Sequence, residues 1–185
     1  MNRKAGEKTG QFGLWLTESL KDFHQYQVYY DHGDPEVDNH VAVIKAFLGE
    51  TVNKDNKLAD VDVMVANQEN EILLLIEIEE SPISPKTLLG DVFACLLSSG
   101  FAVKVEREQV YFRVTAQTQL WIVGTVSGRK AGEGDLIDQV QEKINRMVFD
   151  NENIPIRRVR LIIENELESC LKSLNEESLN YLLNR

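Results

Sequence analysis

Hydrophobic and polar positions follow helical spacing in the first quarter of the chain. Residues 28–30 are a predicted short strand. Before them, apolar residues recur three and four positions apart, which predicts an amphipathic helix: Phe12, Trp15, Leu16, Leu20 and Phe23. A second helix is predicted over 35–48, because Asp34 can cap it, Pro35 suits its first position, and its apolar residues share one face: Val37, Val41, Ile44 and Leu48.

The middle of the chain alternates in the way that strands do. Two strands are predicted over 58–66 and 71–79, joined by a turn-prone segment over 67–70, so the pair is expected to form a hairpin. The second of these strands is apolar on both faces over 72–76. A strand of that kind belongs in the middle of a covered sheet.

The remaining elements complete a layered fold. Ser84 and Pro85 predict the start of a buried helix that ends before Gly100. Beyond it we expect strands over 110–115 and 120–126, a helix over 135–148, a strand over 159–163 and a helix over 168–183. This order predicts an α/β domain with a mixed central sheet flanked by helices, occupying residues 11–185 after a flexible segment over 1–10.

Composition narrows the classes of protein. The chain has 185 residues, and 30 acidic against 20 basic residues give a net charge of −10. No apolar run reaches the roughly 20 residues that span a bilayer, the first ten residues lack the apolar core of a secretory signal, and Cys95 and Cys170 are the only cysteines. We therefore expect a cytoplasmic protein without membrane contact, and any contact with DNA to be local or aided by divalent cations.

Four carboxylates stand at the ends of the predicted hairpin strands. Residues two apart in a strand share a face, so Asp60 pairs with Asp62, and Glu77 pairs with Glu79. If the hairpin brings these ends together, the acids repel one another unless a cation or protons compensate their charge. Mg²⁺ is the cation that such carboxylate oxygens are expected to bind. Acids are also common where a strand ends and its last side chains face solvent, and in that alternative the four carboxylates form no site. What favours a site is Glu77, which directly extends an apolar strand where an ionised group needs a partner.

These residues resemble the PD-(D/E)XK nuclease superfamily, over roughly residues 35–126. Its motif places an Asp on one strand and Glu-x-Lys on the next, within a core of helix, strands, helix and strand. Asp62 matches the motif Asp, with Asp60 as the alternative, and Glu77 follows 77 − 62 = 15 residues later. The resemblance implies a restriction-endonuclease-like fold, with Asp62 and Glu77 as ligands of Mg²⁺ or Mn²⁺, and a homodimer is expected on resemblance alone.

The resemblance assigns the remaining site residues with two departures. Val61 replaces the Pro of the motif, and Glu79 stands where Lys is usual, so Lys86 in the following helix is the candidate for a displaced lysine. The helix acid of the motif, a third metal ligand, is assigned to Glu36, with Glu18 and Glu50 as substitutes. Glu36 has an ordinary structural explanation too, since acids in a first helical turn suit the helix dipole, and Lys86 fits a solvated lysine in a first turn.

Two functions from different classes follow. The first is metal-dependent hydrolysis of DNA, in which Asp62 and Glu77 bind the metal and Glu79 or Lys86 positions or activates water. The second is a nuclease fold without catalysis, acting as an interaction or specificity module in a larger complex, which Glu79 and the net charge both favour. An α/β domain unrelated to nucleases remains if the two strands do not pair. No phosphate loop, dinucleotide-binding motif, hydrolase elbow or zinc-finger spacing is present in the sequence.

Overall fold

The computed structural model describes residues 6–34, 38–105, 108–125 and 133–184. In this part of the chain four helices cover a sheet of eight strands, which confirms the predicted α/β fold with a mixed sheet flanked by helices. The elements in chain order are α1 (Glu7–Leu20), β1 (Tyr26–Tyr30), β2 (Ile44–Phe47), β3 (Lys57–Val61), β4 (Val63–Asn67), β5 (Glu71–Glu79), α2 (Pro85–Leu97), β6 (Gly100–Val105), β7 (Glu108–Thr125), α3 (Glu133–Asp150), β8 (Arg158–Glu164) and α4 (Leu167–Leu183).

The strand β7 joins the two parts of the sheet. Strands are hydrogen-bonded in the order β1-β4-β5-β7-β6-β2-β3, and β8 pairs with β7. The C-terminal half of β7 runs parallel to both β5 and β8, while its N-terminal end runs antiparallel to β6. Two predicted strands over 110–115 and 120–126 are therefore one long strand, with residue 126 outside the described part.

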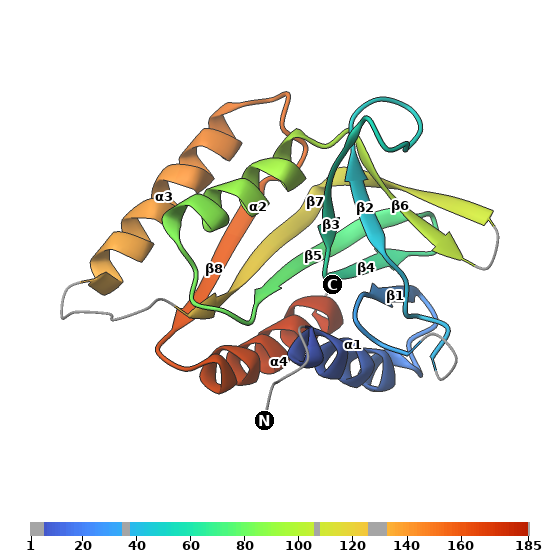
Figure 1. Cartoon of the computed structure of the whole chain (residues 1–185), viewed down its shortest axis with the longest axis horizontal. Coiled ribbons are helices and arrows are strands. Elements are labelled where there is room, and N and C mark those ends of the chain that lie inside the picture. Colours follow the sequence, from blue (N-terminus) through green and yellow to red (C-terminus); the bar gives the residue numbers. More distant parts are fainter. Residues whose placement is uncertain (1–5, 35–37, 106–107, 126–132, 185) are drawn as a thin grey trace.

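Helices cover both faces of the sheet. Figure 1 shows α2 and α3 on one side and α1 and α4 on the other. Two apolar clusters fill the space between these layers. One contains Val92 of α2 and Ile144 of α3, and the other contains Leu16 of α1 and Leu174 of α4. Because β5 is apolar on both faces over 72–76, it contributes to both clusters, as predicted for a central strand. Within the described residues, no helix combines the length and the hydrophobicity that a membrane crossing requires.

The helix predicted over 35–48 is wrong. Residues 38–43 are not helical, and Ile44–Phe47 form β2, while residues 35–37 lie outside the described part. Ile44 and Ala46 are buried with Lys45 between them, which is the two-residue period of a strand, and β2 pairs with β3 on one side and β6 on the other. Asp38 accepts hydrogen bonds from Tyr30 and His40, so its side chain competes with helical backbone bonding.

Three other boundaries differ from the predictions. α1 begins at Glu7, four residues before the predicted start of the domain. β6 was not predicted, although it begins at Gly100, where the preceding helix was expected to have ended. The predicted strand over 58–66 is interrupted at Asp62, so that β3 pairs with β2 while β4 pairs with β1 and β5. The hairpin of β4 and β5 around residues 67–70 is confirmed, and Asn70 adopts a left-handed conformation with φ of 58°.

Candidate functional site

Asp62 lies at the point where the chain passes from one part of the sheet to the other. It is the single residue between β3 and β4, and its carbonyl oxygen accepts a hydrogen bond of 2.8 Å from the backbone N–H of Asp31. The backbone N–H of Ile78 donates to its carboxylate Oδ2 at 2.7 Å. At this break the carboxylate of Asp62 thus accepts the hydrogen bond that a backbone carbonyl group would accept in a regular sheet. The side chain of Asp62 is thereby held against β5.

Glu77 of β5 is the direct neighbour of Asp62. The antiparallel register pairs Val63 with Ile76, which places Asp62 opposite Glu77 with both side chains on one face. Only 8% of the surface of Glu77 is exposed. Within the described part of the chain its carboxylate has two long contacts: the backbone N–H of Asp62 lies 3.4 Å from Oε2, and the thiol of Cys95 lies 3.9 Å from Oε1.

A third carboxylate reaches the same site from α2. Asp91 lies half-buried on α2, and its Oδ2 atom is buried without a hydrogen-bond partner among the residues that the structure describes. Sequence reasoning missed this residue, although a signal was present. Asp91 is the only charged residue between Lys86 and Lys104, in a segment that is otherwise apolar or small and polar. Like Glu77, Asp91 is an ionisable group in an apolar setting and therefore needs a partner.

The three carboxylates border one open cavity of about 540 Å³. The C-terminal end of β5, the break between β3 and β4, the start of α1 and the residue His32 surround it. His32 has a positive φ of 63°, and no sequence pattern marked it. The polar side chains that line the cavity are Thr9, His32, Asp60, Asp62, Glu77, Glu79, Glu80, Ser81 and Asp91. Among these described residues, His32 is the only basic one.

Burial and mutual repulsion make these acids hard to ionise. Burial raises the pKa of Asp62 from 3.8 to about 6, against the opposing effect of its hydrogen bond from Ile78. Burial, followed by the charges of Asp62 and Asp91, holds the pKa of Glu77 well above its usual value. Burial and the charge of Glu79 raise the pKa of Asp91 to about 6. At neutral pH the site therefore carries charges that the folded chain alone compensates poorly.

The donor set suits a hard divalent cation. Glu77 and Asp91 have carboxylate oxygens with weak partners or none, and Asp62 adds a third carboxylate beside them. In the described residues, no group of three or more His, Cys, Asp and Glu side chains could hold a metal ion as it stands. Mg²⁺ does not need such a cage, because it is commonly bound through one or two carboxylates and keeps several water molecules.

The other predicted site residues divide into those at the cavity and those away from it. Glu79 lines the cavity, half-buried, on the same face as Glu77. Asp60 also lines it but is exposed and forms an ion pair of 2.8 Å with Lys57. Lys86 is exposed in the first turn of α2 and does not line the cavity. Glu36 lies outside the described residues.

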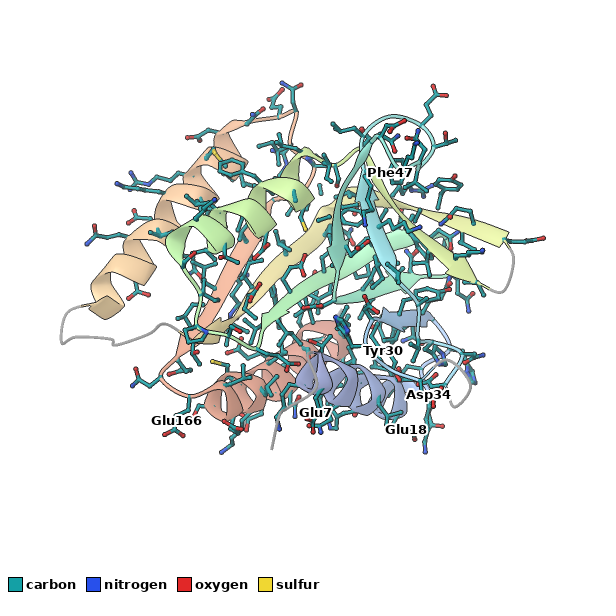
Figure 2. The ribbon with its side chains drawn as sticks, in the orientation of Figure 1. Glu7, Glu18, Tyr30, Asp34, Phe47 and Glu166 are labelled. Carbon is teal, nitrogen blue, oxygen red and sulfur yellow. The ribbon has the colours of Figure 1, made fainter. Side chains whose placement is uncertain are left out.

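Neither substitute for Glu36 reaches the cavity. Glu18 lies on the side of α1 that faces away from the sheet (Figure 2) and pairs with Lys21 at 3.4 Å. Glu50 is exposed in the turn after β2. Instead, the start of α1 contributes its backbone: the N–H groups of Lys8 and Thr9 donate to Oε1 of Glu80 at 2.6 and 3.1 Å. The first helix thus contacts the acids at the end of β5 through its positive end.

Comparison with known proteins adds no relative. No family model matches the chain, and neither a curated protein nor a solved structure matches it.

Proposed function

We propose that this chain is a Mg²⁺-dependent or Mn²⁺-dependent nuclease domain of restriction-endonuclease-like fold that hydrolyses phosphodiester bonds of DNA. The observation that carries the proposal is the placement of Asp62 and Glu77 opposite each other on paired strands, at a break that opens into a cavity. The order α1, then β1, β4 and β5, then α2 and β7 supports it, because it follows the helix, strands, helix, strand order of the nuclease core.

Asp62 and Glu77 are the proposed metal ligands, and Asp91 takes the place of a helix acid. Bound Mg²⁺ would lower the pKa of a water molecule and stabilise negative charge on the phosphate. The acids would hold the cation by their oxygens and would release more protons the lower the pH at which it binds, since burial raises the pKa of both Asp62 and Asp91 to about 6.

The lysine of the Glu-x-Lys motif has no counterpart at its usual position in this chain. Glu79 occupies it, and Lys86 is exposed away from the cavity. His32 lines the cavity and acts on Asp62, whose pKa it lowers against the larger effect of burial. We assign to His32 the role of a hydrogen-bonding group near the phosphate.

A cytosolic location is part of the same proposal. Cys95 and Cys170 are free and buried, as expected for thiols in a reducing compartment.

Cleavage assays test the proposal directly. Plasmid, linear and single-stranded DNA are incubated with the purified chain in Mg²⁺, in Mn²⁺ and in EDTA. We expect metal-dependent cleavage that Glu77→Gln and Asp62→Asn abolish, because each removes a ligand charge. Glu18→Gln is the control, since Glu18 makes only an exposed ion pair worth little stability. Cleavage that survives Glu77→Gln, or that proceeds in EDTA, contradicts the proposal.

The second candidate is an inactive interaction module with the same fold. It is favoured by one observation: no lysine or arginine is among the described residues that line the cavity. Titration calorimetry with Mg²⁺ and Mn²⁺ separates the two functions. Absence of both cleavage and cation binding supports the module, whereas cation binding lost in Glu77→Gln supports the metal site.

A further inference from the structure

Among the described residues, the outer edge of β1 is open at one position. β1 stands at the end of the strand order and pairs with β4 on one side. Along an antiparallel pair, residues that hydrogen-bond to the partner strand alternate with residues whose backbone groups point away from it. The N–H of Asp31 donates to the carbonyl oxygen of Asp62 at 2.8 Å, so Asp31 faces the β4 side. The backbone groups of Tyr26, Val28 and Tyr30 therefore face the outer edge.

The chain itself closes both ends of this edge. At the start of β1, the N–H of Tyr26 donates to the carbonyl oxygen of Phe23 at 3.0 Å. At its end, the N–H of Tyr30 donates to the carbonyl oxygen of His40 at 3.1 Å, and the N–H of Ala42 donates back to Tyr30 at 2.9 Å. What remains is a short gap between two closures, and not the long free edge that leads to aggregation.

Val28 lies in this gap with backbone groups that lack a partner. Its outward N–H and C=O make no hydrogen bond with any residue that the structure describes. Only 4% of the surface of Val28 is exposed. Backbone groups buried to this degree almost always have a partner, because an unpaired one costs about as much as a lost hydrogen bond. The gap thus calls for one acceptor and one donor from outside the described chain.

A pocket of about 280 Å³ opens at this gap. Figure 1 shows α1 beside β1, and the pocket lies between the second half of α1 and the edge of β1, with Val28 among its lining residues. The aromatic rings of Phe23 and Tyr26 also line it, and the hydroxyl of Tyr26 donates to the carbonyl oxygen of Leu182, which holds that ring in place. The volume is close to the lower limit of ligand pockets, about 300 Å³, so the pocket admits a short segment and not a folded domain.

The charge of this pocket is opposite to that of the chain. Lys21, His24 and His40 line it, and none of its described lining residues is acidic, although the chain has a net charge of −10. Lys21 is exposed, and its ammonium group lies 3.4 Å from the carboxylate of Glu18 in a loose ion pair. Nδ1 of His40 lies 2.7 Å from Oδ1 of Asp38, which leaves Nε2 as the second hydrogen-bonding atom of that ring. Together these groups suit a ligand that carries a carboxylate.

We propose that the gap in β1 binds an extended acidic segment of a partner protein, whose main chain pairs with Val28 and whose carboxylate contacts Lys21. Segments that add to a sheet edge gain affinity from main-chain hydrogen bonds and specificity from side-chain pockets. The main chain of the segment supplies the acceptor and the donor that Val28 lacks, and the two aromatic rings flank it. The inference does not depend on the proposed nuclease activity, because no described residue lines both this pocket and the cavity of Asp62 and Glu77.

Fluorescence anisotropy with a short labelled peptide of alternating valine and glutamate tests the proposal on the full chain. We expect saturable binding with a dissociation constant below about 1 mM. The same peptide with lysine in place of glutamate should bind at least about fivefold more weakly. A peptide methylated on its backbone nitrogens should not bind, because it cannot donate to the carbonyl oxygen of Val28. Absence of binding by the first peptide, or equal binding of the methylated one, overturns the proposal.

Two lysine variants separate a local contact from the effect of overall charge. Lys21→Gln should weaken binding of the glutamate peptide about twofold to fivefold, which is the range of an exposed ion pair. Lys143→Gln is the matched control, because Lys143 is exposed on α3 and does not line the pocket. Both substitutions change the net charge equally, so equal losses of affinity would contradict the proposal.

Nuclear magnetic resonance of the isotope-labelled chain locates the bound peptide. The amide proton of Val28 should move downfield on saturation with the glutamate peptide, because a new hydrogen bond deshields it. Val159 is the matched reference, since it is a buried strand valine whose N–H already donates to Oδ1 of Asn145 at 2.8 Å. Binding that leaves the Val28 amide unshifted, or that shifts both amides alike, refutes pairing at the edge of β1.

Discussion

Replacing Asp62 with asparagine is expected to stabilise the metal-free protein at pH 8. The pKa of Asp62 rises from 3.8 to about 6 on folding, and at about 1.4 kcal/mol per pKa unit the charged carboxylate costs the folded state about 3 kcal/mol. Asparagine keeps an oxygen that can accept the hydrogen bond from the N–H of Ile78 and carries no charge. It also removes the charge that raises the pKa of Glu77.

The sign of the pH dependence is fixed by the direction of the shift. Because the folded state binds the proton of Asp62 more tightly than the unfolded state, wild-type stability from this group is greatest below pH 3.8. This contribution to the free energy of unfolding falls as the pH rises from 3.8 to about 6, and above that pH it stays at its lower value. The advantage of Asp62→Asn should therefore be about 3 kcal/mol at pH 8 and less than about 1 kcal/mol near pH 4.

Urea denaturation in EDTA at these two pH values measures the difference in the free energy of unfolding between Asp62→Asn and the wild type. In thermal denaturation of a chain of this length, about 3 kcal/mol corresponds to a rise of roughly 6–12 °C in the unfolding temperature. Asp60→Asn is the control, because Asp60 is exposed and its ion pair with Lys57 is worth at most about 1 kcal/mol. Destabilisation of Asp62→Asn at pH 8, or a gain that does not shrink at low pH, refutes the reasoning.

Three further predictions concern the cation, the ligands and the sheet edge. Mg²⁺ binding should release protons and weaken by about tenfold or more between pH 7.5 and pH 5.5, which calorimetry in buffers of different ionisation enthalpy measures. Asp91→Asn should lower Mg²⁺ affinity in the same titration, whereas Lys86→Ala should leave it unchanged, because only Asp91 lines the cavity. Gln141→Ala with Asn145→Ala should cost roughly 1 kcal/mol per lost hydrogen bond and promote aggregation, as light scattering detects, since these side chains accept hydrogen bonds from the backbone N–H groups of β8 at 2.7 and 2.8 Å.

Strong local signals explain why most elements were predicted. The strand over 71–79 combines an apolar run with turn residues before it, and α2 begins with a serine cap whose hydroxyl accepts a hydrogen bond from the N–H of Thr87 at 3.1 Å. The segment over 35–48 failed because Val41 and Ile44 fit a strand as well as a helix, and β3 and β6 on either side of β2 decided between them.

The neighbourhood of Asp62 and Glu77 was predictable because a hairpin fixes its own register. The contribution of α2 was not, since the rotation of a helix about its axis determines whether Asp91 faces the sheet or the solvent. His32 enters the cavity through a left-handed backbone conformation in the turn after β1, which few non-glycine residues adopt. Such a conformation depends on contacts distant in sequence, because atoms of His32 pack closely against Gly6, which precedes α1, and against Gly10 within it.

The fold itself does not require the acids of the cavity. An apolar residue at Glu77 would simply extend the apolar run of β5, and Asp62 lowers the stability of the folded chain once it is charged. A cation that binds these carboxylates offsets that cost, so Mg²⁺ at 100 times its dissociation constant should stabilise the wild type by about 2.7 kcal/mol and leave Asp62→Asn unchanged. The difference in the free energy of unfolding between Asp62→Asn and the wild type would then be smaller in Mg²⁺ than in EDTA, or would change sign. In an inactive module without a cation, Mg²⁺ would leave the two unfolding curves equally far apart, and the charges of Asp62 and Glu77 would remain a net cost to the fold.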